Sequence, residues 1–391
     1  MMQPKPIVIV APYSPVGSCV TPALGAAKKI AAVASALSTL GHEVVLVNSA
    51  HNASRRAGLQ TDLVEIKEGV AIQMVTLPTY GSRPLGKARN ILQARSIARE
   101  VARTMTGHGA ALLWIYNGYA FECRFALEFI KVTGCPLVVE LEDLPFARKR
   151  PMNIKPRVDD YYMHRVLPLA SLVTCVNDFL PSLLGLSPSK SFLFPGIVDA
   201  GMIEAGLAQP PFGGPLYTAG YFGNLSVEKG ADCLLALAGH LPPNWRLVVT
   251  GAGPLARQFA AYSSAHPDRL RFTHNASDRE VVAGMFQCDV IINPHTSIGG
   301  MGNGIFPFKV IEAVASGRLV ISTPLPACGL DLHSVVLFVE HGAPALRAAL
   351  AGAERFYHLR KSAIQSISQE VRSRYSEASL AGEIRQRFFH A

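Results

Sequence analysis

"NGIFPFKVIEAVASGRLVIST", residues 303–323, indicates the fold class because it reads as a loop, a short helix and a buried strand in direct succession. Pro307 suits the first turn of a helix, and Gly317 suits the residue at which a helix stops. The apolar run after Gly317 predicts a buried strand. The helix has almost no polar face, yet Glu312 lies in its middle. We therefore expect an α/β unit here, with a carboxylate whose position needs an explanation.

The alternation of apolar runs and helical patterns continues on both sides of this segment. Strands are predicted at 7–11, 43–48, 71–77, 111–116, 136–140, 172–176, 191–194, 216–222, 246–250, 270–274 and 290–293, and helices at 21–40, 87–105, 121–132, 229–239, 254–265, 278–287 and 343–390. This order predicts parallel sheets with helices on both faces. The segment 195–215 is rich in glycine and proline and predicts a linker. We expect two doubly wound α/β domains facing across a cleft, at 1–200 and 201–370, and a C-terminal helix at 371–391.

Composition excludes several classes of protein. The chain has 391 residues, 49% of them hydrophobic, and a mean hydropathy of +0.24. However, no apolar run reaches the length of about 18 residues that a spanning helix needs. The N-terminus lacks the ordered parts of a signal peptide. The seven cysteines are scattered without a CxxC pair, which predicts free thiols in a reducing compartment and argues against a zinc site.

The net charge of +9 is not evenly spread, and basic residues gather in the stretch from Arg83 to Arg103. Arg95, Arg99 and Arg103 are spaced by four, so they form one cationic stripe on a helix. The stripe is either a solvated helix face, or a surface for an anionic membrane or a phosphate-bearing acceptor. Nucleic acid is not expected as a partner, because no aromatic residues interleave with the stripe and no binding motif accompanies it.

Ligands of doubly wound sheets bind at the carboxyl ends of strands, so the loops there are the first candidates for a site. Gly17 follows the first strand and lets backbone amides approach an anion, although an ordinary turn explains it too. Lys229 lies in the first turn of a predicted helix, where the helix dipole disfavours a cation. It indicates an anionic partner such as a diphosphate, or else a surface lysine beside Glu228.

Two further loops follow strands of the second half. The sequence around Gly251 is weak as a dinucleotide fingerprint but adequate as a tight turn. A glycine-rich loop precedes the helix of the opening segment, so the amides of Ile305 and Phe306 are expected to point at a ligand. Glu312 leans toward the same helix end and could hold a ribose diol with its two oxygens. The alternative is a salt bridge to Lys309. In that pair the cation precedes the carboxylate along the helix, which is the less favourable order.

Three carboxylates follow a strand of the first half, namely Glu140, Glu142 and Asp143. Carboxylates that face a cleft together raise each other's pKa and could polarise the hydroxyl of an acceptor. Loop solvation or helix capping explains them equally well. Because no histidine or further carboxylate has matching spacing nearby, we expect no metal site.

Several of these segments resemble a known family. The stretches "YFGNLSVEKGADCLLALAGHLPPNWRLVVTGAGPL", "DREVVAGMFQCDVIINP" and "FPFKVIEAVASGRLVIST" look like the second domain of GT-B-fold glycosyltransferases of family 4. In the first half, "VIVAPYSPVGS", "LSTLGHEVVLV" and "LASLVTCVNDFLPSLL" match more weakly. The resemblance implies two Rossmann-like domains that close on a nucleotide-diphosphate sugar. It also implies sugar transfer with retained anomeric configuration, with no cofactor and no required metal.

The resemblance implies roles for individual residues. Lys229 would clamp the diphosphate, Glu312 would bind the ribose, and the base would lie near Gly251 and the segment 274–276. The last helix, 375–390, would cross back onto the first domain. The expected donor-binding residues are Gly17, Asn224, Lys229, Gly251, Asn275, Gly304, Ile305, Phe306, Lys309 and Glu312. The expected catalytic residues are Glu312, Lys229, Glu142 and Asp143.

The chain departs from the family at two of these positions. Asn224 stands where the family usually has arginine, so one fixed charge is missing from the diphosphate site. Gly304 stands where the family has the earlier of two glutamates spaced eight apart. These departures bear on the identity of the sugar and on catalysis.

We therefore expect a cytoplasmic enzyme, peripheral at the inner face of a membrane. It would move a sugar from a nucleotide-diphosphate sugar to a glycan or lipid-linked acceptor in bacterial-type polysaccharide or glycoconjugate assembly. The alternatives are a non-catalytic partner protein with the same fold and a nucleotide-sugar epimerase. Sugar transfer would distinguish the glycosyltransferase from both alternatives, and isomerisation without an acceptor would indicate the epimerase.

Overall fold

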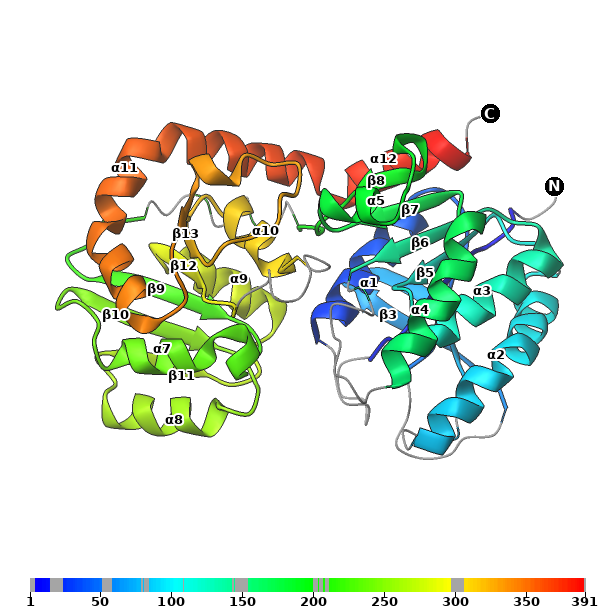
Figure 1. The fold of residues 1–391 in the computed structure, drawn as a ribbon, viewed down its shortest axis with the longest axis horizontal. Helices are drawn as coiled ribbons and strands as arrows, with labels where there is room; N and C mark the ends of the chain where they lie inside the picture. Colours follow the sequence, from blue (N-terminus) through cyan, green and yellow to red (C-terminus); the bar gives the residue numbers. More distant parts are fainter. Residues whose placement is uncertain are drawn as a thin grey trace. The chain divides into compact units, whose positions relative to one another are not determined.

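The chain forms two compact units in the computed structural model (Figure 1). Unit 1 comprises Met1–Ile197 and Glu377–Ala391, and unit 2 comprises Val198–Ser376. The structure describes residues 4–14, 24–50, 58–78, 80, 84–107, 109–142, 144, 154–199, 203, 207, 211–296 and 306–389. The first unit thus takes its last element from the far end of the chain.

Unit 1 is built on an eight-stranded sheet with the order β3-β4-β2-β1-β5-β6-β7-β8. The strands are β1 (Ile7–Ala11), β2 (Val44–Asn48), β3 (Gln60–Lys67), β4 (Val70–Thr76), β5 (Leu112–Tyr116), β6 (Leu137–Leu141), β7 (Leu172–Cys175) and β8 (Ser191–Leu193). All neighbouring strands are parallel except β3, which is antiparallel to β4. Every residue of β1, β2, β5 and β6 is buried, as expected for strands covered on both faces.

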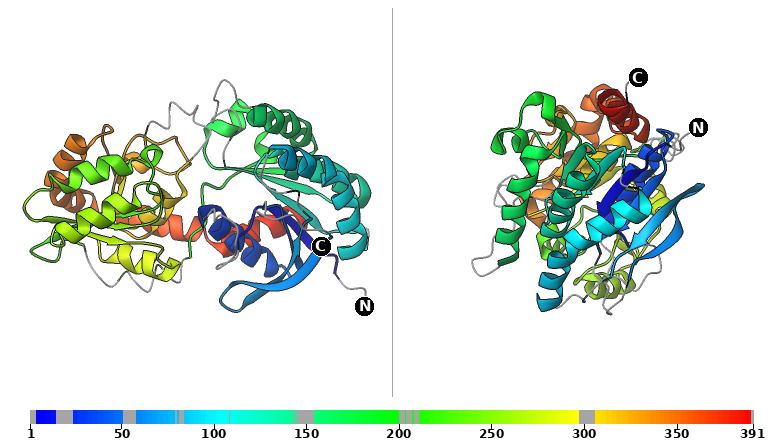
Figure 2. Two further views of the ribbon diagram at one scale, coloured as in Figure 1. Left: turned by 90° about the horizontal axis from the view of Figure 1, so that it is seen from below. Right: turned by 90° about the vertical axis from the view of Figure 1, so that its right-hand side faces the viewer.

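The helices of unit 1 cover both faces of this sheet. They are α1 (Leu24–Ser38), α2 (Pro84–Met105), α3 (Ala120–Thr133), α4 (Ile154–Val166), α5 (Phe179–Leu183) and α12 (Glu377–Phe388). Figure 2 shows α2, α3 and α4 on one side of the sheet and α1 with α12 on the other. The C-terminal helix is anchored at its start, because Ser35 and Lys67 each place a donor 2.7 Å from the carboxylate of Glu377.

Unit 2 is built on a six-stranded parallel sheet with the order β11-β10-β9-β12-β13-β14. The strands are β9 (Tyr217–Phe222), β10 (Trp245–Thr250), β11 (Leu270–Thr273), β12 (Val290–Asn293), β13 (Leu319–Ser322) and β14 (Val336–Phe338). The helices are α7 (Ala231–Ala238), α8 (Ala256–Ala265), α9 (Asp278–Phe286), α10 (Phe308–Ala315) and α11 (Ala343–Arg374). The strand order reverses between β9 and β12, which makes the carboxyl ends of these two strands the place where such folds bind ligands.

The described part of the opening segment, residues 306–323, folds as its residues predict. Its helix is α10 and its strand is β13, and Gly317 between them has a left-handed φ of +68°. Pro307 precedes α10 as its N-cap, one position earlier than predicted. Among the helices and strands of the described residues, four were not predicted from the sequence: β3, α4, the short helix α5 and the short strand β14. The edge strand β3 is mostly exposed and polar and therefore lacks the apolar run of the buried strands.

Among the helices of the described residues, none combines the length and the apolar character of a membrane-spanning segment.

Candidate functional site

Backbone contacts bring the turns after β9 and β10 together. A Cβ atom on Gly251 would lie 1.8 Å from the carbonyl oxygen of Gly223, and one on Gly253 would lie 2.7 Å from the amide nitrogen of Leu225. Both distances are far below van der Waals contact, so only glycine fits. The glycines that predict a tight turn in the sequence therefore also let two chain segments at the edge of the sheet touch.

The turn after β12 is bound to the turn after β9. The carbonyl oxygen of Glu228 accepts hydrogen bonds from the amide of Thr296 at 3.1 Å and from its hydroxyl at 2.8 Å. A Cβ atom on Gly230 would lie 1.9 Å from the carbonyl oxygen of Pro294. The φ of Gly230, +73°, is also left-handed. These contacts hold the residues 226–230 and 294–296 in one arrangement at the point where the strand order reverses.

Lys229 and His295 meet across this junction. Nζ of Lys229 lies 2.9 Å from Nε2 of His295, and 3.5 Å from the carboxylate of Glu228. His295 is 2% exposed, whereas the side chain of Lys229 is 38% exposed. Burial and the charge of Lys229 lower the pKa of His295. Lys229 is thus a cation that is held on one side and open to solvent on the other.

His295 is a candidate site residue that the sequence did not point to. The available signal was its place directly after the apolar run of β12, at the carboxyl end of a central strand. Nothing near His295 in the sequence indicates a partner for its imidazole, since Lys229 is far away along the chain. Only the parallel arrangement of β9 and β12 brings the two side chains together.

The other expected donor residues lie at the same edge of this sheet. Asn224 and Gly251 follow β9 and β10, and Asn275 follows β11 with a left-handed φ of +53°. Both asparagine side chains are exposed. Their positions leave them accessible at the carboxyl ends of three neighbouring strands.

The helix α10 carries the remaining expected donor residues that are described. Phe306 lies just before it and is buried, Lys309 is exposed in its first turn, and Glu312 is 6% exposed. Glu312 is therefore a buried carboxylate in an apolar helix, which packs against β13. Four further expected site residues lie outside the described residues: Gly17, Asp143, Gly304 and Ile305.

A buried cluster occupies the carboxyl edge of the sheet in unit 1. The ammonium of Lys29 on α1 contacts the carboxylates of Glu140, at 2.8 Å, and of Glu142. The indole of Trp114 donates to Glu140 at 2.8 Å, and the hydroxyl of Tyr116 donates to Glu142 at 2.9 Å. Lys29 and Glu140 are 1% exposed, and Glu142 is 20% exposed. The two carboxylates were predicted from the sequence, but the lysine, tryptophan and tyrosine that hold them were not.

Charge balance in this cluster follows from burial. Burial alone lowers the pKa of Lys29, but the charges of Glu140 and Glu142 outweigh it and raise the pKa above the usual range. Burial raises the pKa of Glu140, against the opposite effect of the Lys29 charge. Burial and the Glu142 charge likewise raise the pKa of Tyr116. Glu142 is the member of the cluster with solvent access, so it is the one that a ligand could reach.

A second buried carboxyl lies at the start of α3 in the same unit. Glu122 accepts a hydrogen bond from the hydroxyl of Ser49, which follows β2. Burial raises its pKa to about 7. Asp159 on α4 accepts from the amide of Ala120 at 2.9 Å, and its charge adds to the shift. Glu122 was not predicted, because nothing in a helical run distinguishes a buried glutamate from an exposed one.

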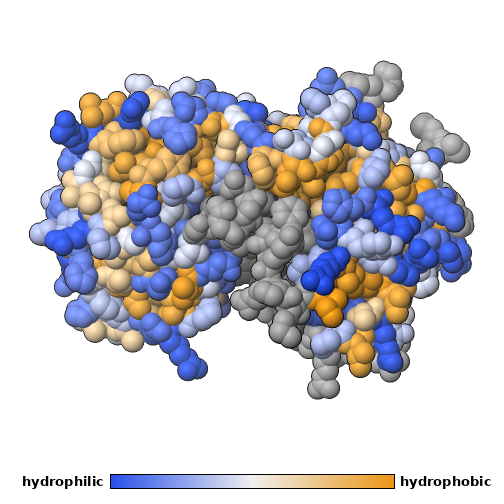
Figure 3. Space-filling model, viewed as in Figure 1, coloured by the Kyte–Doolittle hydropathy of each residue, from blue (hydrophilic) through white to orange (hydrophobic). Residues whose placement is uncertain are grey.

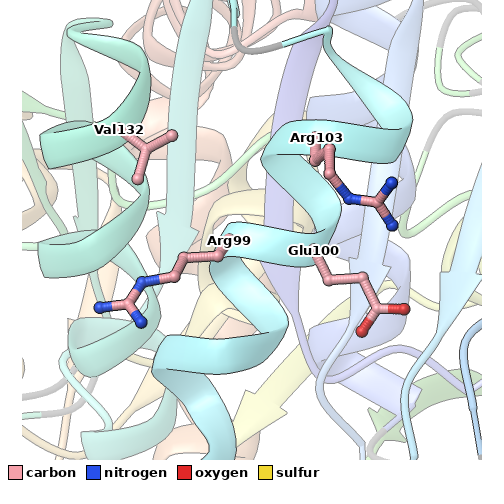
Figure 4. Close-up of a pocket in the computed structure, with 4 residues that line it drawn as sticks. All are labelled: Arg99, Glu100, Arg103 and Val132. Carbon is pink, nitrogen blue, oxygen red and sulfur yellow. The ribbon is translucent and has the colours of Figure 1, made fainter.

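The predicted basic stripe lies on α2 as expected. Arg95, Arg99 and Arg103 are exposed, and Nε of Arg99 lies 2.6 Å from the carboxylate of Glu128 on α3. Figure 4 shows Arg99 and Arg103 at a hollow that Glu100 and Val132 also line. The stripe faces solvent on α2. It lies apart from the sheet edges that carry the Lys229–His295 pair and the Lys29 cluster.

Comparisons with known proteins agree with this architecture. Residues 217–352 match the family model of Glycosyl transferases group 1. The chain is 27% identical over 308 residues to a protein of Arabidopsis thaliana that is one of the subunits of phosphatidylinositol N-acetylglucosaminyltransferase. The match covers 73% of this chain and 60% of that protein, so the chain spans about 60% of the length of this curated relative.

Solved structures match over nearly the whole chain. Sucrose-phosphate synthase of Thermosynechococcus elongatus has a TM-score of 0.72 at 15% identity, covering 98% of both chains. HepE of Anabaena in complex with UDP-glucose has a TM-score of 0.64 at 14% identity, covering 97% of this chain and 98% of the other. α,α-Trehalose-6-phosphate synthase of Burkholderia multivorans has a TM-score of 0.68 at 11% identity, covering 98% of both. The expected fold class, GT-B with two Rossmann-like sheets, is confirmed.

Proposed function

We propose that this chain, which has the GT-B fold and whose residues 217–352 match Glycosyl transferases group 1, transfers a sugar from a nucleotide-diphosphate sugar to a glycan or lipid-linked acceptor. The observation that carries the proposal is the placement of Lys229 where the strand order of unit 2 reverses, at the carboxyl ends of β9 and β12. A solvent-accessible ammonium at this point suits an anionic ligand. Structures of HepE hold UDP or UDP-glucose, which supports a uridine nucleotide as the first donor to test.

The donor side of the proposed reaction uses three features of unit 2. When the bond between the sugar and the diphosphate breaks, negative charge develops on the leaving phosphate. Lys229 and the amides at the start of α10 would stabilise this charge. Glu312 would accept hydrogen bonds from the two ribose hydroxyls, which places the nucleotide beside α10. Transfer would retain the anomeric configuration and need no metal, in line with the resemblance.

A panel of nucleotide sugars tests the donor site. UDP-, GDP-, ADP- and dTDP-sugars are added to the wild type and to Glu312→Ala, and the melting temperature is measured by thermal shift. A ligand at about 100 times its dissociation constant adds about 2.7 kcal/mol to the free energy of unfolding. One nucleotide sugar is expected to raise the melting temperature of the wild type. The same compound is expected to leave the melting temperature of Glu312→Ala unchanged.

The matched control for this panel is Glu370→Ala, which removes an exposed carboxylate from α11 of the same unit. It is expected to respond to the donor as the wild type does. If no nucleotide sugar stabilises the wild type, the donor site does not exist. If Glu312→Ala responds fully, the ribose role of Glu312 is wrong.

On the acceptor side, we assign Glu142 to a hydroxyl of the acceptor, because it is the member of its cluster with solvent access. Its carboxylate is oriented by Lys29 and by Tyr116. It still has lone pairs that can accept a hydrogen bond from an acceptor hydroxyl. Asp143, which follows it in sequence, belongs to the same assignment.

Replacing Glu142 by glutamine, alone and together with Asp143→Asn, is expected to lower turnover by about tenfold to a hundredfold, the lower part of the range typical of acid–base groups. Donor affinity stays as in the wild type, because the donor site lies in the other unit. Steady-state kinetics with separate donor titrations measures both quantities. Unchanged turnover in the double variant removes Glu142 and Asp143 from the acceptor site.

We also place the enzyme at an anionic membrane surface on the cytoplasmic side, where a lipid-linked acceptor of polysaccharide or glycoconjugate assembly would be met. The basic stripe on α2 shares its exposed helix face with Leu85 and Leu92, both largely exposed. Figure 3 shows apolar residues among hydrophilic ones over the part of unit 1 where α2 lies. Basic residues attract anionic lipids, and apolar side chains between them insert into the interface.

Sedimentation with liposomes tests this placement. The wild type is expected to pellet with vesicles that contain anionic phosphatidylserine and to stay in the supernatant with neutral ones. Arg95, Arg99 and Arg103 changed together to glutamine should cost roughly 1 kcal/mol each near a charged surface, which is about two orders of magnitude in partitioning. The control Arg355→Gln, Arg360→Gln, Lys361→Gln removes three charges from α11 in unit 2. Equal pelleting of the stripe variant and the wild type contradicts the placement.

A second candidate is a non-catalytic partner protein with the same fold. It is favoured by Asn224, an exposed amide at the position where the resemblance implies a diphosphate-binding arginine. Donor binding by the wild type without sugar transfer to any acceptor would select this candidate.

A further inference from the structure

Two contacts define the protonation of the buried His295. Its Nδ1 lies 2.7 Å from the carbonyl oxygen of Thr296, and its Nε2 lies 2.9 Å from Nζ of Lys229. A carbonyl oxygen can only accept a hydrogen bond, so Nδ1 carries the proton and donates it. An ammonium can only donate, so Nε2 is unprotonated and accepts. The neighbours of the imidazole therefore select one neutral tautomer.

We propose that His295 is a positioning residue, which holds the ammonium of Lys229 at the carboxyl ends of β9 and β12 so that it meets the diphosphate of the donor. The inference rests on the proposed function, and it identifies Nε2 of His295 as the group that holds Lys229. A lysine has a flexible four-carbon side chain with about 2 kcal/mol of rotamer entropy. A fixed acceptor lowers the cost of placing it. Because Asn224 brings no charge to this edge, the placement of Lys229 carries more of the diphosphate binding.

The backbone around His295 is suited to this role. The hydroxyl of Thr323 donates to the carbonyl oxygen of His295 at 2.8 Å. Thr296 is bound through its amide and its hydroxyl to the carbonyl oxygen of Glu228, the residue before Lys229. The acceptor nitrogen and the lysine are thus attached to the same small network of hydrogen bonds. A shift of the backbone of Lys229 relative to the backbone of His295 would have to break this network.

The charges around the imidazole keep it neutral. Burial, Lys229 and His341 lower the pKa of His295, whereas the carbonyl of Thr296 and the carboxylate of Glu228 raise it. The net effect lowers the pKa, so the neutral form is present through the physiological range and Nε2 keeps its lone pair. Protonation at lower pH would remove the acceptor and place a second cation beside Lys229.

The pair can be tested without any ligand. Nitrogen-15 NMR of the full chain labelled at histidine reports the tautomer and the pKa of His295, whose signal is assigned by its loss in His295→Gln. The signal is expected to show a protonated Nδ1 and an unprotonated Nε2. Lys229→Met is expected to raise the pKa of His295 toward its ordinary value, because it removes a charge that lowers it. Lys361→Met, on α11, is the control and should leave it unchanged.

The role in binding is tested with the nucleoside diphosphates UDP, GDP and ADP as probes, by calorimetry on the full chain. His295→Leu removes the acceptor and is expected to weaken binding about tenfold, which corresponds to about 1.4 kcal/mol. His295→Gln can accept with its amide oxygen and should stay within about threefold of the wild type. In a Lys229→Met background, His295→Leu should cause no further loss of nucleotide affinity, because His295 acts through Lys229.

Each outcome decides a different point. If Lys229→Met leaves the pKa of His295 unchanged, or if NMR finds the opposite tautomer, the hydrogen bond between Lys229 and His295 is wrong. Wild-type binding in His295→Leu, or a full additive loss in the double variant, overturns the positioning role. An intact pair in a wild type that binds none of the three nucleotides overturns the proposed function, and with it the role of the pair in donor binding. Melting curves of all variants check that each is folded.

Discussion

Lys29→Met is expected to lower the free energy of unfolding of unit 1 by about 3–5 kcal/mol at pH 7. The reason is that Glu140 and Glu142 would be left facing each other without the ammonium that now lies between them. Glu140 is almost completely buried, and the hydrogen bond from Trp114 would be left to compensate its charge. A buried carboxylate without a cation either remains charged at high cost or takes up a proton.

The loss of stability should shrink as the pH is lowered from 7. The pKa of Glu140 is already raised in the folded wild type, and removing Lys29 raises it further. A group with a raised folded pKa contributes stability at low pH, which disappears as the pH rises through that pKa. The variant therefore recovers part of its stability where Glu140 takes up its proton. The gap between the variant and the wild type is widest at higher pH, where Glu140 is ionised.

Urea unfolding followed by tryptophan fluorescence measures this loss. The chain has two tryptophans, so the experiment is done in a Trp245→Phe background in which Trp114 reports unit 1 alone. Lys67→Met is the matched control, because it breaks a Lys–Glu pair with Glu377 in the same unit at a partly solvent-accessible position. It is expected to cost less than about 1 kcal/mol. Equal losses in the two variants would mean that the buried cluster is not stabilised by its lysine.

Gly230→Ala is expected to destabilise unit 2 by several kcal/mol and to abolish donor binding. Its Cβ atom would lie 1.9 Å from the carbonyl oxygen of Pro294, where no flexible side chain can move aside. The φ of +73° adds a cost of about 1–2 kcal/mol for a residue with a side chain. The turn after β12 must therefore move away from the turn after β9, which separates His295 from Lys229.

Hydrogen exchange measured by mass spectrometry locates this effect. Peptides that cover 226–238 and 290–296 are expected to exchange faster in Gly230→Ala, and nucleotide sugars should no longer raise the melting temperature. Gly239→Ala, at the other end of α7, is the control. Its φ is −71° and its nearest neighbouring atom lies 3.7 Å from the new Cβ, so it should be neutral or slightly stabilising. Wild-type exchange in Gly230→Ala would show that the two turns are not in contact.

Most elements of the fold could be predicted from local patterns. Strands buried on both faces read as short apolar runs, and Gly317 or Gly134 ends a helix through a left-handed φ that other residues avoid. The unpredicted strand β3 shows the limit of this reasoning. Its side chains are mostly polar and mostly exposed, and it becomes a strand only because β4 offers an antiparallel partner.

The candidate site was predictable in part for the same reason. Lys229 and Glu312 could be selected because each violates a local preference, as a cation at a helix start and as a carboxylate within an apolar helix. His295 and Lys29 violate no local rule. Their chemistry comes from partners distant along the chain, Lys229 in one unit and Glu140 with Glu142 in the other.

The amino-acid sequence by itself determined the α/β class, the order of strands and helices, and the loops at which a ligand is expected. These are set by periodicity, by glycine and proline, and by the chirality of the backbone, all of which act over a few residues. The tertiary structure alone decided which titratable groups meet, because the crossing order of parallel strands brings distant loops to one sheet edge. Burial at these meeting points then made His295 a neutral acceptor and Lys29 the buried cation between two carboxylates.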